Sequence, residues 1–72
     1  MPKVDQVYIT GEEIRKRRRG LDITQKEFAQ MLDCHQPNVA RWEAGEVRIS
    51  RRIAKQVIKL LEQLEIEKEE AA

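Results

Sequence analysis

The sequence predicts an all-α domain with four helices, or five, and three observations support that prediction. Helix-capping residues precede three of the expected helices, and apolar residues within the helices recur at the spacing of one helix face. The three glycines and two prolines stand at expected helix ends or in the N-terminal arm. A chain of 72 residues has room for a single domain with one small core.

The first two helices start with the same capping pattern. Thr10 and Glu13 have the spacing of a capping box, in which each side chain bonds to the backbone N–H group of the other residue. Thr24 and Glu27 repeat this pattern. We expect the corresponding helices at about 11–19 and 25–32.

The third and fourth helices are marked by residues at their ends. A turn over 33–35 leads into a helix over 36–44, where Pro37 occupies the first turn and costs no hydrogen bond. Gly45 then suits the left-handed conformation that ends many helices. Ser50 is placed to cap the fourth helix.

Composition and motifs exclude several classes of function. Cys34 is the only cysteine and His35 the only histidine, so the chain can form no internal disulfide and lacks the four ligands of a structural zinc site. The sequence has no glycine-rich phosphate loop and no apolar run near the ~20 residues that span a bilayer. We therefore expect a cytoplasmic protein that is not an enzyme, with no metal, no cofactor and no membrane partner.

The short turn between the second and third helices places the third helix for reading DNA. Two short helices joined in this way form the unit that lays its second helix in the major groove. Gln36 can pair with adenine and Arg41 can fork onto guanine, while small side chains let the backbone approach the bases. A plain solvent-exposed face is the alternative, and spacing alone leaves both open. The outward-facing residues are Gln36, Pro37, Ala40, Arg41 and Ala44.

Three segments of the chain carry a specific combination of residues. They are I-T-G-E-E-I-R at 9–15, I-T-Q-K-E-F-A-Q-M-L at 23–32 and N-V-A-R-W-E-A-G at 38–45. Through them, residues 10–52 resemble the Cro/cI-type, or xenobiotic-response-element, helix-turn-helix family. The resemblance implies a compact lambda-repressor-like fold and DNA binding. Within the family it points to short phage regulators and to regulators of toxin–antitoxin operons.

The resemblance also implies which side chains contact DNA. Gln25 would bind phosphate at a helix start, where free N–H groups attract anions. Arg48, Arg51 and Arg52, hereafter the basic clamp, would hold the phosphate backbone beside the fourth helix. Asn38 completes the implied phosphate contacts. The predicted base contacts are Gln36, Pro37, Ala40 and Arg41. They rest both on the resemblance and on the outward face of the third helix described above.

Three positions depart from the family pattern. Asp33 stands where the family has glycine in the turn, and aspartate tolerates the left-handed conformation with some strain. His35 replaces the usual Ser or Thr cap and caps less well. Pro37 replaces a residue that often hydrogen-bonds a base, which leaves apolar contact as its means of readout. We expect the fold to survive all three changes.

Charge is distributed unevenly along the chain. Residues 1–52 hold eleven Lys and Arg against eight Asp and Glu, whereas residues 53–72 hold three against five. Within the run R-K-R-R-R at 15–19, the resemblance assigns Arg18 to an interhelical salt bridge with Glu43. The remaining arginines, Arg15, Arg17 and Arg19, are expected to add general positive potential.

The fourth helix, expected to continue at least to Leu64, has an apolar stripe too wide for a single contact. A stripe of roughly 160° exceeds the ~100° that a small core requires, so one edge is left for a second copy of the chain. A monomeric core that uses the whole stripe is the alternative. The core-facing edge comprises Ala54, Ile58 and Leu61, and the predicted homodimer interface comprises Ile53, Val57, Leu60 and Leu64.

Two hypotheses for function follow. The first is a sequence-specific transcriptional regulator that represses from a palindromic operator as a homodimer. The second is an antitoxin that neutralises a partner toxin and regulates its own operon. A helical adaptor without DNA contacts is disfavoured by the basic clamp. The expected organisation is an N-terminal arm at 1–8, a helix-turn-helix DNA-binding domain at 9–65 and an acidic C-terminal tail at 66–72, of which 67–72 are expected to fray.

Overall fold

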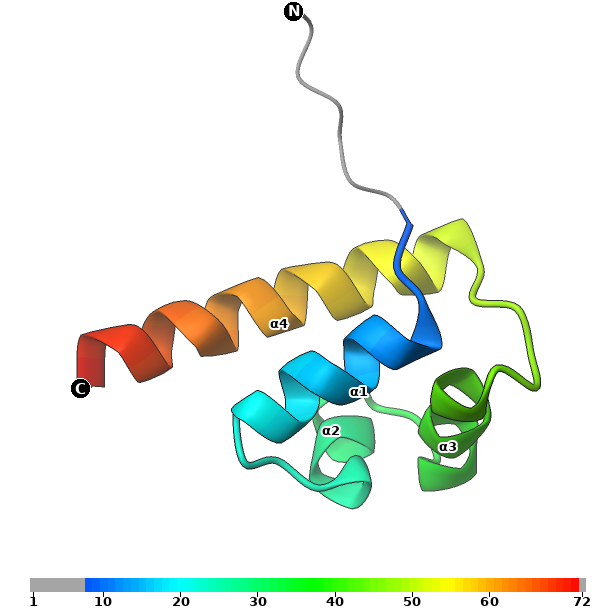
Figure 1. The fold of residues 1–72 in the computed structure, drawn as a ribbon, viewed down its shortest axis with the longest axis horizontal. Coiled ribbons are helices and arrows are strands. Elements are labelled where there is room, and N and C mark those ends of the chain that lie inside the picture. Colours follow the sequence, from blue (N-terminus) through cyan, green and yellow to red (C-terminus); the bar gives the residue numbers. More distant parts are fainter. Residues whose placement is uncertain (1–7, 72) are drawn as a thin grey trace, which may run out of the picture.

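The computed structural model describes residues 8–71, and within them the chain forms four helices and no strand (Figure 1). The long last helix runs along one side of the three shorter ones. This is the predicted all-α architecture, with no fifth helix in the described part. The predicted arm at 1–8 lies outside the described residues except for Tyr8. The helices are α1 (Gly11–Gly20), α2 (Gln25–Met31), α3 (Gln36–Ala44) and α4 (Arg51–Ala71).

Side-chain caps begin three of the helices. At α2 the capping box is complete, because the Glu27 N–H donates to Thr24 Oγ1 (3.0 Å) and the Thr24 N–H donates to the Glu27 carboxylate (2.9 Å). At α1 only half of the predicted box forms, with Thr10 Oγ1 accepting from the Glu13 N–H (3.1 Å). Ser50 caps α4, because its hydroxyl oxygen accepts a hydrogen bond from the Ile53 N–H at 3.2 Å. The predicted helix starts therefore rest on local hydrogen bonds.

Backbone conformation closes the three short helices. Asp33 has a φ of 56°, the left-handed conformation expected of it in the turn before α3, and Gly45 ends α3 with a φ of 74°. α1 ends at Gly20, but Asp22 is the residue that turns left-handed, with a φ of 57°. His35 makes no side-chain cap bond to α3, which fits its expected weakness as a cap.

One apolar core joins the four helices. Phe28 of α2 and Ile14 of α1 are fully buried, and α4 contributes Val57 and Leu61 without exposed surface. Removing a side chain of this size from water contributes about 1.5–3 kcal/mol to folding. None of the helices in residues 8–71 is long and apolar enough to span a membrane. The buried apolar residues are Ile9, Ile14, Phe28, Ala29, Val39, Trp42, Ala54, Val57, Ile58 and Leu61.

The start of α1 packs directly against the end of α3. A Cβ atom at Gly11 would overlap the carbonyl oxygen of Trp42 and would approach Glu43 Cα to 3.0 Å. Only a residue without a side chain lets the two backbones come this close. The contact therefore fixes the position of α3 relative to α1.

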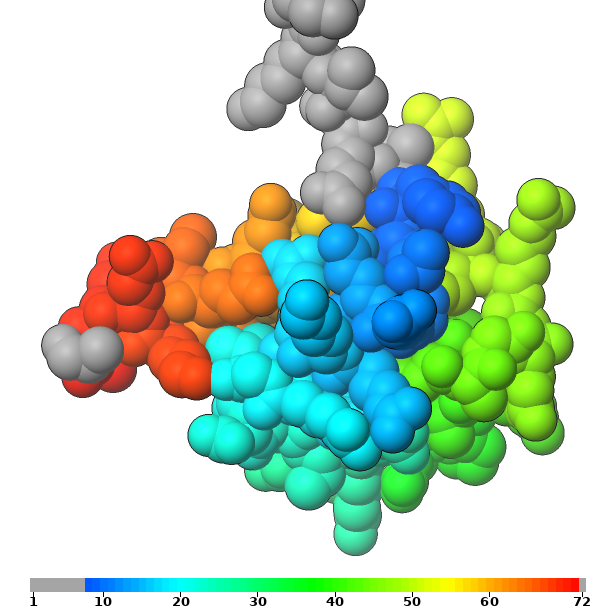
Figure 2. Space-filling view, in the orientation of Figure 1, coloured from blue at the N-terminus to red at the C-terminus, as the bar shows by residue number. Residues whose placement is uncertain are grey.

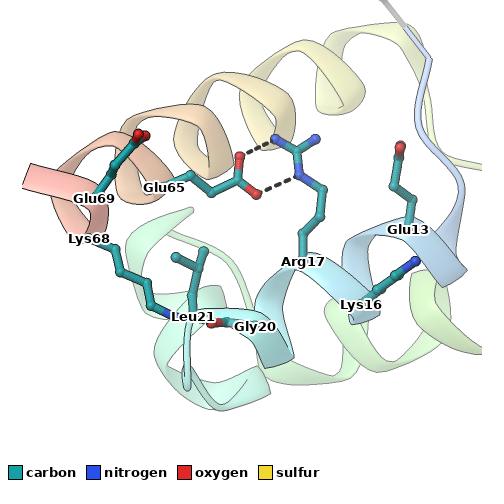
Figure 3. Close-up of a pocket in the computed structure, with 8 residues that line it drawn as sticks. All are labelled: Glu13, Lys16, Arg17, Gly20, Leu21, Glu65, Lys68 and Glu69. Carbon is teal, nitrogen blue, oxygen red and sulfur yellow. Dashed lines mark hydrogen bonds and ion pairs between the residues drawn. The ribbon is translucent and has the colours of Figure 1, made fainter. Parts of the chain in front are cut away.

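The C-terminal end of α4 projects past the shorter helices (Figure 2) and is held to α1 by polar bonds (Figure 3). Arg17 donates two hydrogen bonds to Glu65, at 2.9 and 2.6 Å, and the Lys68 ammonium donates to the Gly20 carbonyl oxygen. The prediction that 67–72 fray is wrong for 67–71, which are helical. Helix ends fray where nothing holds them, and here two side chains tie the last turns of α4 down.

Candidate nucleic-acid interface

Helix α3 has one buried face and one exposed face. Val39 has no exposed surface and Trp42 is 9% exposed, so these two side chains turn one face of α3 to the core. On the other face, Ala40 is half-buried and the remaining predicted residues are exposed. The structure thus brings all five predicted residues together on one surface. This surface, hereafter the outer face of α3, comprises Gln36, Pro37, Ala40, Arg41 and Ala44.

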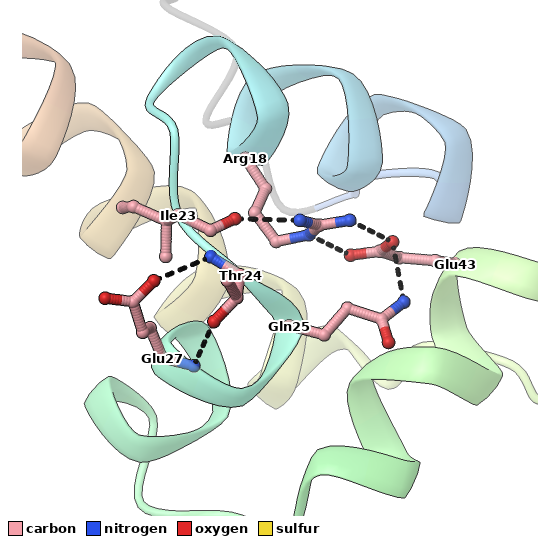
Figure 4. Close-up of polar contacts among 6 residues, drawn as sticks. All are labelled: Arg18, Ile23, Thr24, Gln25, Glu27 and Glu43. Carbon is pink, nitrogen blue, oxygen red and sulfur yellow. Dashed lines mark hydrogen bonds and ion pairs between the residues drawn. The ribbon is translucent and has the colours of Figure 1, made fainter.

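An ion pair between α1 and α3 holds the outer face in place (Figure 4). Arg18 and Glu43, for which the family resemblance implies an interhelical salt bridge, are joined by two hydrogen bonds of 2.7 and 2.9 Å. Arg18 also donates to the Ile23 carbonyl at 2.8 Å, which ties in the segment before α2. The side chains of the pair are 10% and 4% exposed, so the pair is largely shielded from water and from screening by salt.

Both members of this buried pair are charged at neutral pH. Burial acts to raise the pKa of Glu43, but hydrogen bonds from Arg18 and Gln25 outweigh it and hold that pKa below its ordinary value. The hydrogen bond to Glu43 raises the pKa of the Arg18 guanidinium. The pair is therefore a permanent link between α1 and α3 rather than a group that titrates near neutral pH.

Gln25, an expected phosphate contact, is engaged within the protein. Its amide nitrogen donates to Glu43 Oε1 at 3.1 Å, and its side chain is half-buried. A primary amide carries two N–H groups, so one is left for an external acceptor. Sequence reasoning missed the bond to Glu43, because only the packing of α2 against α3 brings the two side chains together.

The basic clamp lies in the segment that follows α3. Arg48 is in the loop and Arg51 and Arg52 begin α4, and all three are exposed. Within residues 8–71 none of them forms a salt bridge. Asn38, the other expected phosphate contact, is half-buried in the first turn of α3. The clamp thus presents three cations to solvent in the segment that follows α3.

The run of basic residues in α1 is divided by helical position. Arg17 faces α4 and pairs with Glu65, whereas Arg18 faces α3 in the buried pair. Arg17 therefore does not add the free positive potential expected of it. Arg15 and Arg19 are exposed and lie one turn apart on a third side. Glu65 is 48 positions from its partner, and no local signal in the sequence could have identified it.

The predicted dimer interface lies only partly at the surface. Val57 has no exposed surface within a single chain, so it is not available to a second copy. Val57 is buried because α4 packs across the other helices, so a wider part of its apolar stripe faces the core. Ile53, Leu60 and Leu64 are half-buried along the edge of α4. Beside Leu60 the surface is hollowed between α2 and α4, where Met31 is 48% exposed.

Cys34 belongs to the turn between α2 and α3. It is half-buried against the core, and its N–H donates to the Ala29 carbonyl at 2.9 Å. Burial raises the pKa of its thiol, which keeps the thiol protonated at neutral pH. In the part of the chain that the structure describes, no three His, Cys, Asp or Glu side chains are grouped as a metal site would require.

Comparison with known proteins connects this geometry to a family. A family model described as helix-turn-helix matches residues 14–68, which is most of the chain. The match includes α2, α3, the turn between them and all but the end of α4. Neither the curated proteins nor the solved structures gave a match. The chain therefore belongs to the Cro/cI-type, lambda-repressor-like helix-turn-helix family, whose members bind DNA and are not enzymes.

Proposed function

We propose that this domain is a sequence-specific transcriptional repressor that binds a palindromic operator as a homodimer. The observation that carries the proposal is the outer face of α3, which stays open to solvent while a buried ion pair and a close backbone contact hold the helix on α1. Base readout requires that donors and acceptors be held within about 0.5 Å of their productive positions. A helix fixed from behind meets that requirement.

The side chains of the outer face define the bases that it reads. Arg41 presents a planar fork to O6 and N7 of guanine, and Gln36 presents an amide to N6 and N7 of adenine. Pro37 and Ala40 offer apolar contact to thymine methyl groups. The expected half-site therefore contains both a G·C pair and A·T pairs.

Phosphate contacts place the outer face in its register on the duplex. The basic clamp supplies three exposed cations, and Gln25 and Asn38 supply amide N–H groups. Contacts of this kind carry no sequence information, but they fix the orientation of the protein and account for much of its affinity. The clamp lies in the loop after α3 and in the first turn of α4, from where it would grip the phosphate backbone.

A second copy would pack along the edge of α4 formed by Ile53, Leu60 and Leu64. An interface of this kind relates the two copies by twofold symmetry and places two α3 helices in successive major grooves, about 34 Å apart. The contact spans fewer than two heptads, so we expect DNA to strengthen it. A dimer bound across a promoter would exclude RNA polymerase by occupying its site.

Substitution of Leu64 tests the dimer. Leu64→Glu should leave the protein folded, because this side chain is only half-buried, and should make it monomeric. Sedimentation measures the association state, and circular dichroism monitors the fold. A wild-type protein that binds one copy per site and stays monomeric at high concentration would contradict the dimer.

Selection of bound sequences from random duplex DNA tests the proposal as a whole. We expect two inverted half-sites with centres about 10 base pairs apart. Arg41→Ala should relax the specificity at one base pair per half-site, with a loss of about 1–3 kcal/mol of binding free energy at that position. Arg51→Ala should instead weaken binding to every sequence. The proposal fails if no sequence is enriched, or if Arg41→Ala selects the same motif as the wild type.

A further inference from the structure

A shallow hollow lies in the surface between α1 and α3. The hollow has a volume of about 200 Å³, and α1 lines it with Arg15, Arg18 and Arg19. In Figure 2, the surface of α1 (blue to cyan) borders that of α3 (green) on one face of the molecule. The remaining lining residues are Gln25, Ala40, Glu43 and Ala44.

The hollow carries a net positive charge. Among residues 8–71, Glu43 is the only carboxylate that lines it, and Arg18 already neutralises Glu43 through two hydrogen bonds. Arg15 and Arg19 are exposed, and neither forms a salt bridge within residues 8–71. Two exposed guanidinium groups that form no salt bridge within residues 8–71 therefore share one small site. Each presents a planar set of N–H donors that matches the oxygens of a phosphate group.

The hollow also lies at one edge of the outer face of α3. Ala40 and Ala44 belong to both surfaces, and their small side chains leave the space that the hollow occupies. Around the axis of α3, Glu43 on the hollow side and Arg41 on the far edge stand about 160° apart at 100° per residue. The basic clamp comes from the segment after α3, whereas the cations of the hollow come from α1. The two groups of cations therefore belong to different elements of the fold.

We infer that this hollow is a second phosphate-binding site for the DNA backbone, formed by Arg15 and Arg19. The inference rests on the proposed seating of α3 in the major groove. That groove is about 12 Å wide, and an α-helix with its side chains has nearly the same diameter, so phosphates of both strands border a helix that lies in it. Arg15 and Arg19 hold the border that lies on the side of the hollow.

The site has a mechanical consequence for readout. Arg18 stands in the same helix as Arg15 and Arg19 and joins that helix to α3 through Glu43. A phosphate bound on α1 therefore positions a rigid unit of two helices rather than a mobile side chain. Such contacts fix register without reading bases, so the site should support all sequences equally.

Binding measured across a range of salt concentrations tests this inference. On the operator obtained by selection, log affinity falls as log salt rises. Arg15→Gln and Arg19→Gln should each make this negative slope shallower by about 0.9, and the double variant should make it shallower by about twice that. Over a fourfold change in salt, each lost contact corresponds to about a 3.5-fold difference in affinity. Fluorescence anisotropy with labelled duplex gives the affinities. The Arg15→Lys and Arg19→Lys variants should retain most of the slope.

Lys16→Gln is the matched control. Lys16 is exposed on the same helix and carries the same charge, but it lines the hollow between α1 and α4 instead. Its substitution should change the slope by much less than that of Arg15. The thermal midpoints of all the variants should match the wild type, because Arg15 and Arg19 make no salt bridge within residues 8–71.

The outcomes separate this inference from the function on which it rests. A double variant whose slope equals that of Lys16→Gln overturns the phosphate site and leaves the proposed function standing. A changed base preference in the double variant also overturns the phosphate site, because that result would show that Arg15 or Arg19 contacts bases. A wild-type protein that enriches no duplex overturns both the function and the site.

Discussion

Arg17 and Arg18 are neighbours in α1 that make similar ion pairs in different surroundings. Arg17 donates to Glu65 at 2.9 and 2.6 Å, and Arg18 donates to Glu43 at 2.7 and 2.9 Å. The side chains of the Arg18 pair are 10% and 4% exposed, whereas those of the Arg17 pair are 21% and 39% exposed. Bond geometry is nearly the same, so the difference in strength must come from water and salt, which screen the outer pair.

The two pairs also hold different parts of the molecule. The buried pair fixes α3 against α1, next to the close contact at Gly11. The outer pair spans a surface hollow of about 610 Å³ between α1 and the end of α4, where Leu21 is among the lining residues (Figure 3). The outer face of α3 is therefore held rigidly from within, whereas the end of α4 is held only at the surface.

Breaking the buried pair should have the largest effect. Glu43→Gln leaves the Arg18 guanidinium without its counter-charge in a site that excludes water, and should lower the free energy of unfolding by about 3 kcal/mol. Arg18→Met strands the Glu43 carboxylate and should destabilise to a similar degree. Urea denaturation measures both. Wild-type stability in the two variants would mean that the buried pair is not what holds α3.

Filling the contact at Gly11 should have the next largest effect. Gly11→Ala forces α1 and α3 apart, because the new Cβ would overlap the Trp42 carbonyl, and should cost about 2 kcal/mol. Gly20→Ala is the matched control at the other end of α1. Apart from its own helix and its chain neighbours, nothing in residues 8–71 lies within 4 Å of a Cβ at Gly20, and its substitution should stabilise by about 0.5 kcal/mol. Equal thermal midpoints for the two variants would contradict the tight contact.

Acid should weaken both pairs. Burial tends to raise the pKa of Glu43, but its hydrogen bonds hold that pKa below the ordinary 4.5, and the bonds from Arg17 likewise lower the pKa of Glu65. A carboxylate with a lowered pKa stabilises fully above its ordinary value, and this contribution is lost as the pH falls through the lowered one. Thermal midpoints from neutral pH to about pH 2 should therefore fall less steeply for Glu43→Gln and for Glu65→Gln than for the wild type. A variant whose midpoint falls as steeply as that of the wild type would mean that its carboxylate is not stabilised by the pair.

Local signals explain why the helices could be predicted from the sequence. The capping box at Thr24 and the left-handed Asp33 depend on residues within a few positions of each other, so the chain specifies them without tertiary contacts. The outer face of α3 followed from helical spacing once the turn was recognised. The Arg18–Glu43 pair joins residues 25 positions apart, and only the family resemblance indicated it.

The rest depends on how the helices cross, which spacing does not specify. A helical wheel placed Val57 on the apolar stripe of α4, but the depth to which it is buried depends on the angle at which α4 crosses its neighbours. The bonds from Arg17 to Glu65 and from Lys68 to Gly20 each join residues 48 positions apart. Without them the acidic end of α4 has the composition of a frayed tail, and that is what the sequence led us to expect.

Breaking the outer pair should have the smallest effect on global stability. Both Arg17 and Glu65 are partly exposed, so Glu65→Gln should cost only about 0.5 kcal/mol after screening by solvent. Its effect should instead be local, because Glu65 and Lys68 are the side chains that tie the last turns of α4 to α1.

Amide hydrogen exchange resolves this local effect. In the Glu65→Gln, Lys68→Ala double variant, amides over 65–71 should exchange faster while those of α3 keep wild-type rates, since local opening follows the contacts that are lost. Gln63→Ala serves as the control, because its amide bonds to Glu67 of the same helix, at 3.5 Å, and to no other group in residues 8–71. Faster exchange in α3 of the double variant would mean that the two ends of the domain are coupled, and that the outer pair supports the outer face of α3 as well.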